Sequence, residues 1–573
     1  MPNTVILGFS QVFGEEEVRP IETYFSGISR KTLLKVGALL IYFNTIEANN
    51  GKTDNEEVLG RWFGNHNSKE RNRLYNLILE IEKNIETKIH IITTQGSLSF
   101  FEYVFDHITE EVDLKAEAQL ELDLFKGYLL INQKIVNEAD ETAIHTTNNL
   151  SGFSKVTAMS ICRSLGYWDT LNYDIREILL AQFAKLSHFI DFSSTSLKLS
   201  YLCNKFLENL ECDSWKKFLI KYLPVILFEL SKGDKTITSI EVPVNEDYEE
   251  NKRFLENYML QDKNPIADVD FRLIRNSPLF KEDEGKYTII YNLFLIEKLY
   301  KSLMFNLRSL NLTLENDKKI PELNSFICQN FSENYLFYNE IQSIFRNTTI
   351  LKTGSEIKAT GVTAEPDLYI RNNNNIVLFE SKDIQIESTV KMSSDYGIIS
   401  DALKSKLYFD TKANGNIKPK AVKQLVLNLN RVLDKTFQFD SDYDTKDLKI
   451  YTVIVVYERL FEVPGLNRLL ISWFKDELLA NGLALNQTIR PVILINFDLF
   501  IFYKPIIENN IDLFCATIEE YFIEIDKNEI EPLERLQSFN HYFRNKFRAK
   551  YSDIATHAGN RIMEISKMQI GEL

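Results

Sequence analysis

The chain has 573 residues, which is more than one hydrophobic core usually organises, so about two to four domains are expected. Apolar residues make up 44% of the chain and aromatic residues 12%, which excludes a largely disordered protein. The formal charge of −15 excludes a protein that coats nucleic acid without specificity, because such proteins are basic. The acidity is uneven, since about −11 of the charge falls before residue 316 and about −4 after it.

The cysteines and the first residues bear on the cellular compartment. The five cysteines are scattered and show no CxxC spacing, so neither a disulfide framework nor a zinc knuckle is expected. The chain does not begin with the basic and apolar segments of a signal peptide. It also contains no run of roughly 18 uncharged apolar residues that could span a bilayer. We therefore expect a cytoplasmic protein without a membrane partner.

The first 315 residues are predicted to be mainly helical. Apolar residues recur at three- and four-residue spacings over the segments 31–48, 68–88, 174–191 and 198–230. The last segment is expected to form two helices that break near Asp213–Ser214, with Pro224 kinking or ending the second. No residue type in this half specifies a reaction. A scaffold, an oligomerisation surface and a sensor that controls the rest of the chain all stay open as its role.

Three regions are predicted along the chain. Residues 1–150 and 151–315 are interpreted as two helical regions, and residues 316–573 as one domain with a C-terminal helical extension. Within the second region, residues 283–308 are predicted to form a short strand followed by one long apolar helix. We expect that helix to join the two halves of the chain.

A different pattern begins near residue 330. Residues 332–345 have the apolar spacing of an amphipathic helix, and a short extended stretch follows. Two apolar segments, 364–371 and 376–386, then flank Asn372–Asn375. Because asparagine tolerates left-handed backbone conformations, this pattern predicts a β-hairpin.

Charged residues interrupt both strands of this hairpin. Asp367 lies at the start of the first strand, and Glu380 and Lys382 share one face of the second because side chains alternate along a strand. Residues 376–379 are apolar on both faces, which predicts a central strand. A carboxylate and an ammonium on a central strand cost free energy that core packing does not explain. We therefore interpret these residues as a functional site.

Hydrolysis of a phosphodiester accounts for each of these residue types. A divalent cation neutralises the phosphate and lowers the pKa of the attacking water, and Mg²⁺ needs only one or two carboxylates. Asp367 and Glu380 could supply them, and the carbonyl of Ser381 could add a third oxygen. Lys382 could orient the water and stabilise developing negative charge. The predicted cofactor is Mg²⁺, for which Mn²⁺ could substitute.

These residues resemble the motif of the PD-(D/E)XK nuclease superfamily: Pro366–Asp367, twelve intervening residues, then Glu380–Ser381–Lys382. The resemblance implies an α/β restriction-endonuclease-like nuclease core in the C-terminal half, preceded by a large, mainly α-helical N-terminal region. Residues 449–457 and 491–503 would supply further strands of that core. The resemblance covers about a third of the chain.

The same resemblance assigns roles to residues around the motif. In this superfamily a preceding helix carries an accessory catalytic carboxylate. Glu340 matches it best, and Glu333 is its rival. The segment 418–433 resembles the helix that follows the motif, and Gln424 stands where many members place a glutamine near the site.

Basic residues follow the motif. We predict that Lys418, Lys420, Lys423 and Arg431 bind nucleic acid, since cations beside the carboxylates would offset phosphate repulsion. A solvated helix face explains the same pattern equally well. The basic residues between Arg544 and Lys550 are interpreted as surface charges rather than as a binding site.

The leading hypothesis is a Mg²⁺-dependent nuclease that cuts DNA, although nothing in the motif excludes RNA. A large acidic helical half favours a bacterial restriction or anti-phage defence effector, in which that half recognises or regulates. The alternative is a non-catalytic nucleic-acid-binding or assembly protein that retains the fold. A homodimer would allow two sites to cut both strands, and a partner subunit or activator also stays open. The chain has no GxxxxGK[ST] sequence, so ATP-driven movement would need a separate subunit.

Overall fold

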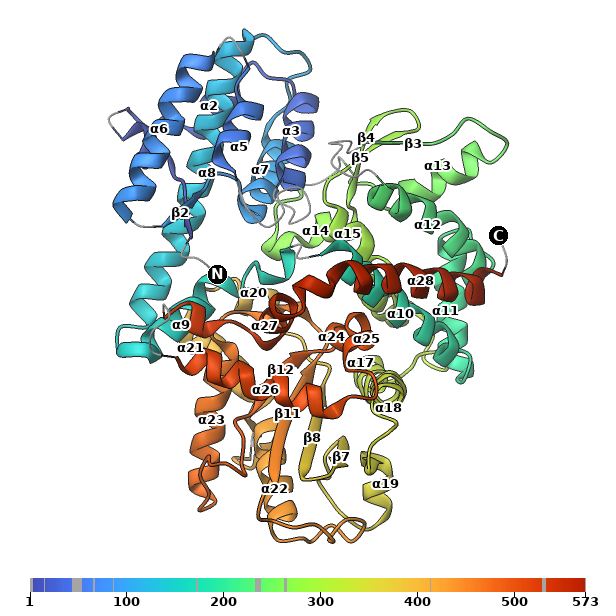
Figure 1. Ribbon diagram of the computed structural model, residues 1–573. Helices are drawn as coiled ribbons and strands as arrows, with labels where there is room; N and C mark the ends of the chain where they lie inside the picture. The colour runs from blue at the N-terminus through green and yellow to red at the C-terminus, as the bar shows by residue number, and fades with distance from the viewer. Residues whose placement is uncertain are drawn as a thin grey trace.

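The chain is mixed α/β, with a mainly helical N-terminal half and a five-stranded sheet in the C-terminal half (Figure 1). This computed structural model describes residues 4–14, 16–43, 54–64, 67–85, 87–171, 174–231, 239–261, 265–412, 414–527 and 532–571.

Helices form most of the N-terminal half, as the apolar spacing predicted. The longer ones are α3 (Arg30–Phe43), α6 (Ser68–Ile85), α7 (Thr94–His107), α8 (Glu117–Thr146), α9 (Gly152–Ser164), α10 (Ile175–Ser193), α11 (Leu197–Asn209), α12 (Trp215–Ser231) and α16 (Lys301–Thr313). The expected break after α11 is present, and α12 continues through Pro224. The part of the predicted helix 31–48 beyond Phe43 lies outside the described residues.

Two small sheets accompany these helices. Their strands are β1 (Thr4–Ile6) parallel to β2 (Lys88–His90), and the antiparallel set β3 (Ser239–Glu241), β5 (Lys286–Ile289) and β4 (Leu279–Asp283). Only β5 corresponds to a strand predicted from the sequence.

The segment after β5 differs from the prediction, because two helices follow it instead of one long helix. These are α15 (Asn292–Glu297) and α16. Tyr300 leaves the helical conformation between them, and the backbone N–H of Lys301 donates to Oε1 of Gln182 at 2.9 Å. A side chain from α10 thus satisfies the first N–H of the new helix. Apolar periodicity within the segment does not encode that tertiary contact.

The sheet of the C-terminal half has the strand order β12–β11–β8–β7–β6. Its strands are β6 (Ile350–Thr353), β7 (Leu368–Asn372) and β8 (Asn375–Lys382), which are antiparallel neighbours, and β11 (Lys449–Val456) and β12 (Ile493–Asn496), which run parallel to β8. The predicted hairpin is confirmed, with Asn373 left-handed at its turn (φ 52°). The prediction that β8 is central is also confirmed.

Two predicted segments change conformation along their length. The segment 491–503 contains β12 but continues as helix α24 (Asp498–Phe502), so only its first part is a strand. Short apolar runs do not distinguish a buried strand from a buried helix, and all of α24 is buried. The segment 332–345 is helical, but it lies in a π-helix, η4 (Ile327–Phe337), followed by α18 (Tyr338–Ile344).

Helices cover both faces of the sheet. On one face α22 (Ala421–Leu433) packs against β8 and β11, with α23 (Leu466–Ala480) beside it. On the other face η4 packs against β8, where the ring centroids of Phe337 and Phe379 lie 6.1 Å apart. Among the described helices, none combines the length and the apolar character that crossing a membrane requires.

Helix α10 connects the two halves through buried charges. It packs against α24 and against α28 (Tyr551–Ile570), which crosses the middle of the molecule (Figure 1). Glu177 of α10 accepts hydrogen bonds from Arg544, at 2.7 Å for the shortest. Lys185 of the same helix lies 2.5 Å from Asp498, and both side chains are buried. The helix is therefore bonded to the C-terminal half by pairs that solvent does not screen.

Candidate active site

The hairpin brings together the three charged residues of the motif. Leu368 pairs with Phe379 across β7 and β8, so the preceding Asp367 lies opposite Glu380 on the same face. Lys382 is two residues further along that face. Its Nζ lies 2.8 Å from Oε1 of Glu380 and 3.9 Å from Oδ2 of Asp367. The structure thus places these side chains in one cluster, which we call the acidic cluster.

Backbone contacts fix the position of Asp367. The N–H of Ser381 donates to Oδ2 of Asp367 at 2.6 Å, and the N–H of Asp367 donates to the carbonyl of Phe379 at 3.0 Å. The N–H of Gly354 donates to the carbonyl of Asp367 at 2.8 Å. A Cβ at Gly354 would lie 3.1 Å from the carbonyl oxygen of Pro366, so a side chain there would crowd the motif.

Burial makes the acidic cluster costly to charge. Glu380 is fully buried, and burial, followed by the charge of Asp367, raises its pKa well above the usual range of a glutamate. Burial also raises the pKa of Asp367, against the opposing charge of Lys382. Burial alone would lower the pKa of Lys382, but the two carboxylates hold it above its usual value. Within the described part of the chain, Oε2 of Glu380 has no hydrogen-bond partner. In this buried cluster two carboxyl groups thus share one ammonium.

A third carboxylate, Glu333 on η4, belongs to the same cluster. Burial raises the pKa of Glu333, the charge of Asp367 raises it further, and Lys382 opposes both effects. Glu333 in turn raises the pKa of Glu380. These mutual effects place its side chain within electrostatic reach of all the motif charges.

Glu340 is directed elsewhere. Nε2 of His188 lies 3.0 Å from its Oε1, and Arg561 of α28 pairs with the same oxygen. Burial alone would raise the pKa of Glu340, but the hydrogen bond to His188 and the charge of Arg561 lower it to about 2. The geometry thus favours Glu333 over Glu340 as the accessory carboxylate. In an α-helix Glu333 and Glu340, seven residues apart, would lie on the same face. In a π-helix each N–H bonds to a carbonyl five residues away, so the helix has more residues per turn and the two side chains point in different directions.

Exchange of these two glutamates for glutamine should separate their roles. Glu340→Gln should lower the free energy of unfolding by about 3 kcal/mol at pH 7, because Arg561 loses its counter-ion. The pKa of Glu340 is lower in the folded than in the unfolded state, so this loss should shrink as the pH falls from 4.5 to about 2. Glu333→Gln should leave stability unchanged or higher, since it removes charge from the acidic cluster. Chemical denaturation at pH 7 and pH 3.5 measures both effects, and equal losses in the two variants would contradict the assignment.

Ser381 lies between two motif charges, with its side chain on the opposite face of β8. Its Oγ lies 2.9 Å from the hydroxyl of Tyr457, which donates to the carbonyl of Ser332 at 2.8 Å. The N–H and C=O of a strand residue point the same way, so the carbonyl of Ser381 faces Asp367 as its N–H does. Sequence reasoning missed Tyr457. It ends the predicted strand 449–457, and polar residues at the carboxyl ends of neighbouring parallel strands meet at one sheet edge.

Of the four predicted basic residues, Lys420 lies within electrostatic reach of the acidic cluster. Lys420 is the residue before α22, and its pKa is lowered by burial and by the charges of Lys418 and Lys382. Lys418 is exposed on β10 (Ile417–Pro419). Gln424 follows Lys420 by one helical turn, and its N–H donates to the carbonyl of Lys420 at 2.9 Å. It therefore shares a face of the helix with Lys420.

The other two basic residues are engaged within the protein. Nζ of Lys423 lies 2.6 Å from Oε2 of Glu477 on α23. The guanidinium of Arg431 donates to the carbonyls of Ala364 and Thr363, at 3.0 and 2.6 Å. These contacts hold α22 to α23 and to the segment that leads into the motif. Only a tertiary structure reveals them.

The residues present fit a divalent cation such as Mg²⁺. Asp367 and Glu380 offer carboxylate oxygens and Ser381 a carbonyl oxygen, which are the ligands that Mg²⁺ prefers. The unpartnered Oε2 of Glu380 supports the fit within the described residues. No group of three or more histidine, cysteine, aspartate or glutamate side chains in those ranges is arranged to hold a metal. Water would have to complete the coordination shell, as it commonly does for Mg²⁺.

Comparison of the chain with models of protein families, with curated proteins and with solved structures finds no match. The functional argument therefore rests on the acidic cluster. It consists of a carboxylate and a lysine on the central strand β8 and a carboxylate at the start of the neighbouring strand, with Glu333 beside them.

Proposed function

We propose that the chain is a metal-dependent nuclease that hydrolyses phosphodiester bonds in DNA. The observation that carries this proposal is the contact of Lys382 with Glu380, on the same face of β8, and with Asp367, which lies opposite Glu380 just before β7. Such a cluster costs folding free energy, and perturbed buried charges of this kind are typical of functional sites. The hairpin, the two parallel strands and the helices on both faces support a restriction-endonuclease-like core.

Each residue has a separate part in the proposed reaction. Asp367, Glu380 and the carbonyl of Ser381 hold Mg²⁺ or Mn²⁺. When bound, the cation neutralises the scissile phosphate and lowers the pKa of the attacking water. Lys382 donates to that water and to the phosphate oxygen on which negative charge develops. Lys420 adds positive charge beside the phosphate.

Cleavage assays test this proposal. The protein is incubated with plasmid, linear duplex DNA, single-stranded DNA and RNA, each with Mg²⁺, Mn²⁺ or EDTA. We expect metal-dependent cutting of DNA by the unaltered protein and by Asp476→Asn, which changes an exposed carboxylate on α23. Glu380→Gln should not cut. If only RNA is cut, the substrate is RNA and not DNA. If Glu380→Gln cuts as fast as the unaltered protein, the assignment of the active site is wrong.

The same assays decide between catalysis and a non-catalytic role in nucleic-acid binding or assembly. That alternative predicts binding without cutting under every metal condition. The presence of all the motif charges favours catalysis, because a non-catalytic site would gain stability by losing one of its buried carboxylates. An effector role in bacterial restriction or anti-phage defence, with the helical half recognising or regulating, extends the proposal. A homodimer would let two such sites cut both strands.

A further inference from the structure

A cavity of about 670 Å³ lies between the helical half and the sheet. Asp383, which directly follows Lys382, lines it from the sheet side. Phe305 and Arg308 of α16 line it from the helical side. A cavity of this size accommodates a small organic ligand or one nucleotide unit. It therefore offers binding space one residue beyond the acidic cluster.

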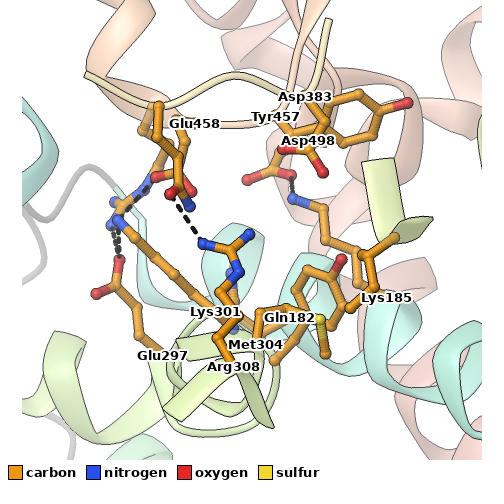
Figure 2. Close-up of a pocket in the computed structure, with 14 residues that line it drawn as sticks. Gln182, Lys185, Glu297, Lys301, Met304, Arg308, Asp383, Tyr457, Glu458 and Asp498 are labelled. Atoms are coloured by element: carbon orange, nitrogen blue, oxygen red, sulfur yellow. Dashed lines mark hydrogen bonds and ion pairs between the residues drawn. The ribbon is translucent and has the colours of Figure 1, made fainter. Parts of the chain in front are cut away.

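Most charges that line the cavity are already paired. Asp169 lies 3.2 Å from Arg275 and 3.3 Å from Lys391. Lys301 lies 3.4 Å from Glu297, and both also line a smaller pocket, drawn in Figure 2, that shares lining residues with this cavity. The pair with Lys391 joins the helical half to the C-terminal half, and the other two pairs lie within the helical half. None of these pairs needs a ligand to balance its charge.

Arg308 is an exception. Arg308 also lines the smaller pocket, and Figure 2 shows it extending from the helical side toward the sheet side of that pocket. Its one hydrogen bond within the described residues runs from Nη1 to Oε1 of Gln385, at 2.9 Å. In the same part of the chain no carboxylate lies within ion-pair distance of Arg308, and its Nε has no partner. A guanidinium with unused donors suits a phosphate group.

Phe305 provides an apolar surface next to that guanidinium. Its side chain is 43% exposed, and the guanidinium carbon of Arg308 lies 5.2 Å from the centre of its ring. An exposed ring offers a stacking surface for a base of any identity. The amide of Gln385, which also lines the cavity, can bond to a base edge. The wall thus combines the groups that recognise the base and the phosphate of a nucleotide.

Positive charges connect the cavity with the acidic cluster. Lys406 lines the cavity, and its charge acts on Lys420. Lys420 also feels the charge of Lys382. A strand with a phosphate at Lys382 could follow these lysines, so that a neighbouring nucleotide enters the cavity.

We propose that this cavity binds one nucleotide unit, with its base on the ring of Phe305 and its phosphate on Arg308. Because Asp383, the residue after Lys382, lines the cavity, we assign this unit to a single-stranded part of the nucleic acid that is cut. The assignment of the bound unit to the nucleic acid that is cut rests on the proposed function. A free nucleotide would present the same base and phosphate to the cavity. The favoured substrate is thus DNA with a single-stranded segment next to the cleavage position.

Binding measured in EDTA tests the cavity separately from cleavage. Fluorescence anisotropy follows a labelled single-stranded DNA 15-mer, and calorimetry follows dTMP and ATP. Phe305→Ala and Arg308→Gln should each weaken oligonucleotide binding by about fivefold or more. Phe305→Tyr should bind as the unaltered protein does, because it keeps the ring. The controls Leu312→Ala, exposed on the same helix, and Lys318→Gln should have no effect.

The outcomes separate this proposal from that of the nuclease. If the protein binds through Phe305 and Arg308 but never cuts, the assignment of the cavity stands and the assignment of the active site is wrong. If the variants lose affinity for dTMP or ATP but not for the oligonucleotide, the cavity is a nucleotide site whose ligand is a free nucleotide. Unchanged affinity in both variants, or no binding of either ligand by the unaltered protein, would overturn the proposal. Thermal melting verifies that each variant is folded.

Discussion

Replacing Lys382 with methionine should slow DNA cleavage by about a hundredfold or more, because it removes the ammonium that acts in the transition state. Methionine keeps the apolar stem and removes the group that contacts Glu380 and Asp367. Substrate binding should change little, since Lys420 still provides positive charge. Single-turnover rates at saturating Mg²⁺ measure the effect without interference from product release.

The matched control for this variant is Lys449→Met. Lys449 lies on the neighbouring strand β11, opposite the first residue of β8, and its Nζ lies 4.0 Å from Glu519. It should cut at the rate of the unaltered protein. Lys382→Arg should recover only part of the activity, because a planar guanidinium does not replace a compact ammonium. Full activity in Lys382→Met would exclude this lysine from the chemistry.

The second large effect is expected on stability. Arg544→Ala should lower the free energy of unfolding by about 3–5 kcal/mol, because it leaves two buried carboxylates without a cation. Arg544 contacts Glu177 and Glu462, each at 2.7 Å, and these carboxylate side chains are 5% and 3% exposed. Urea denaturation at pH 7 measures the loss.

A nearby arginine provides the control for that experiment. Arg548 is exposed, so Arg548→Ala should change the free energy of unfolding by less than about 0.5 kcal/mol. Adding Glu177→Gln and Glu462→Gln to Arg544→Ala should restore part of the lost stability, since no buried charge then lacks a partner. Equal stability of Arg544→Ala and Arg548→Ala would show that the buried triad contributes nothing.

Local patterns predicted the hairpin and the cluster on it. Alternation along a strand fixes which side chains share a face, and the asparagines fix the turn, so Asp367, Glu380 and Lys382 could be grouped from their spacing alone. Local patterns also led us to interpret the basic residues 544–550 as surface charges. That interpretation is wrong for Arg544, which is buried between two glutamates.

Features that depend on distant contacts were not predictable. The choice between Glu333 and Glu340 depends on the π-helical turns of η4 and on His188 and Arg561, which lie far away in sequence. The pairing of Lys423 with Glu477 likewise joins two helices that share no local pattern. Sequence patterns report which residues are charged, but the tertiary structure decides which charges a partner already neutralises.

Helix α10 belongs by its contacts to a part of the chain that lies far beyond it in sequence. Its Lys185 and His188 bond to Asp498 and Glu340, on both sides of the motif. A recombination event that exchanged the N-terminal half of this chain for another at residue 316 would leave those carboxylates buried and unbalanced. A viable crossover would therefore have to fall before Asp169, which pairs with Lys391, so that both this residue and α10 are inherited together with the sheet.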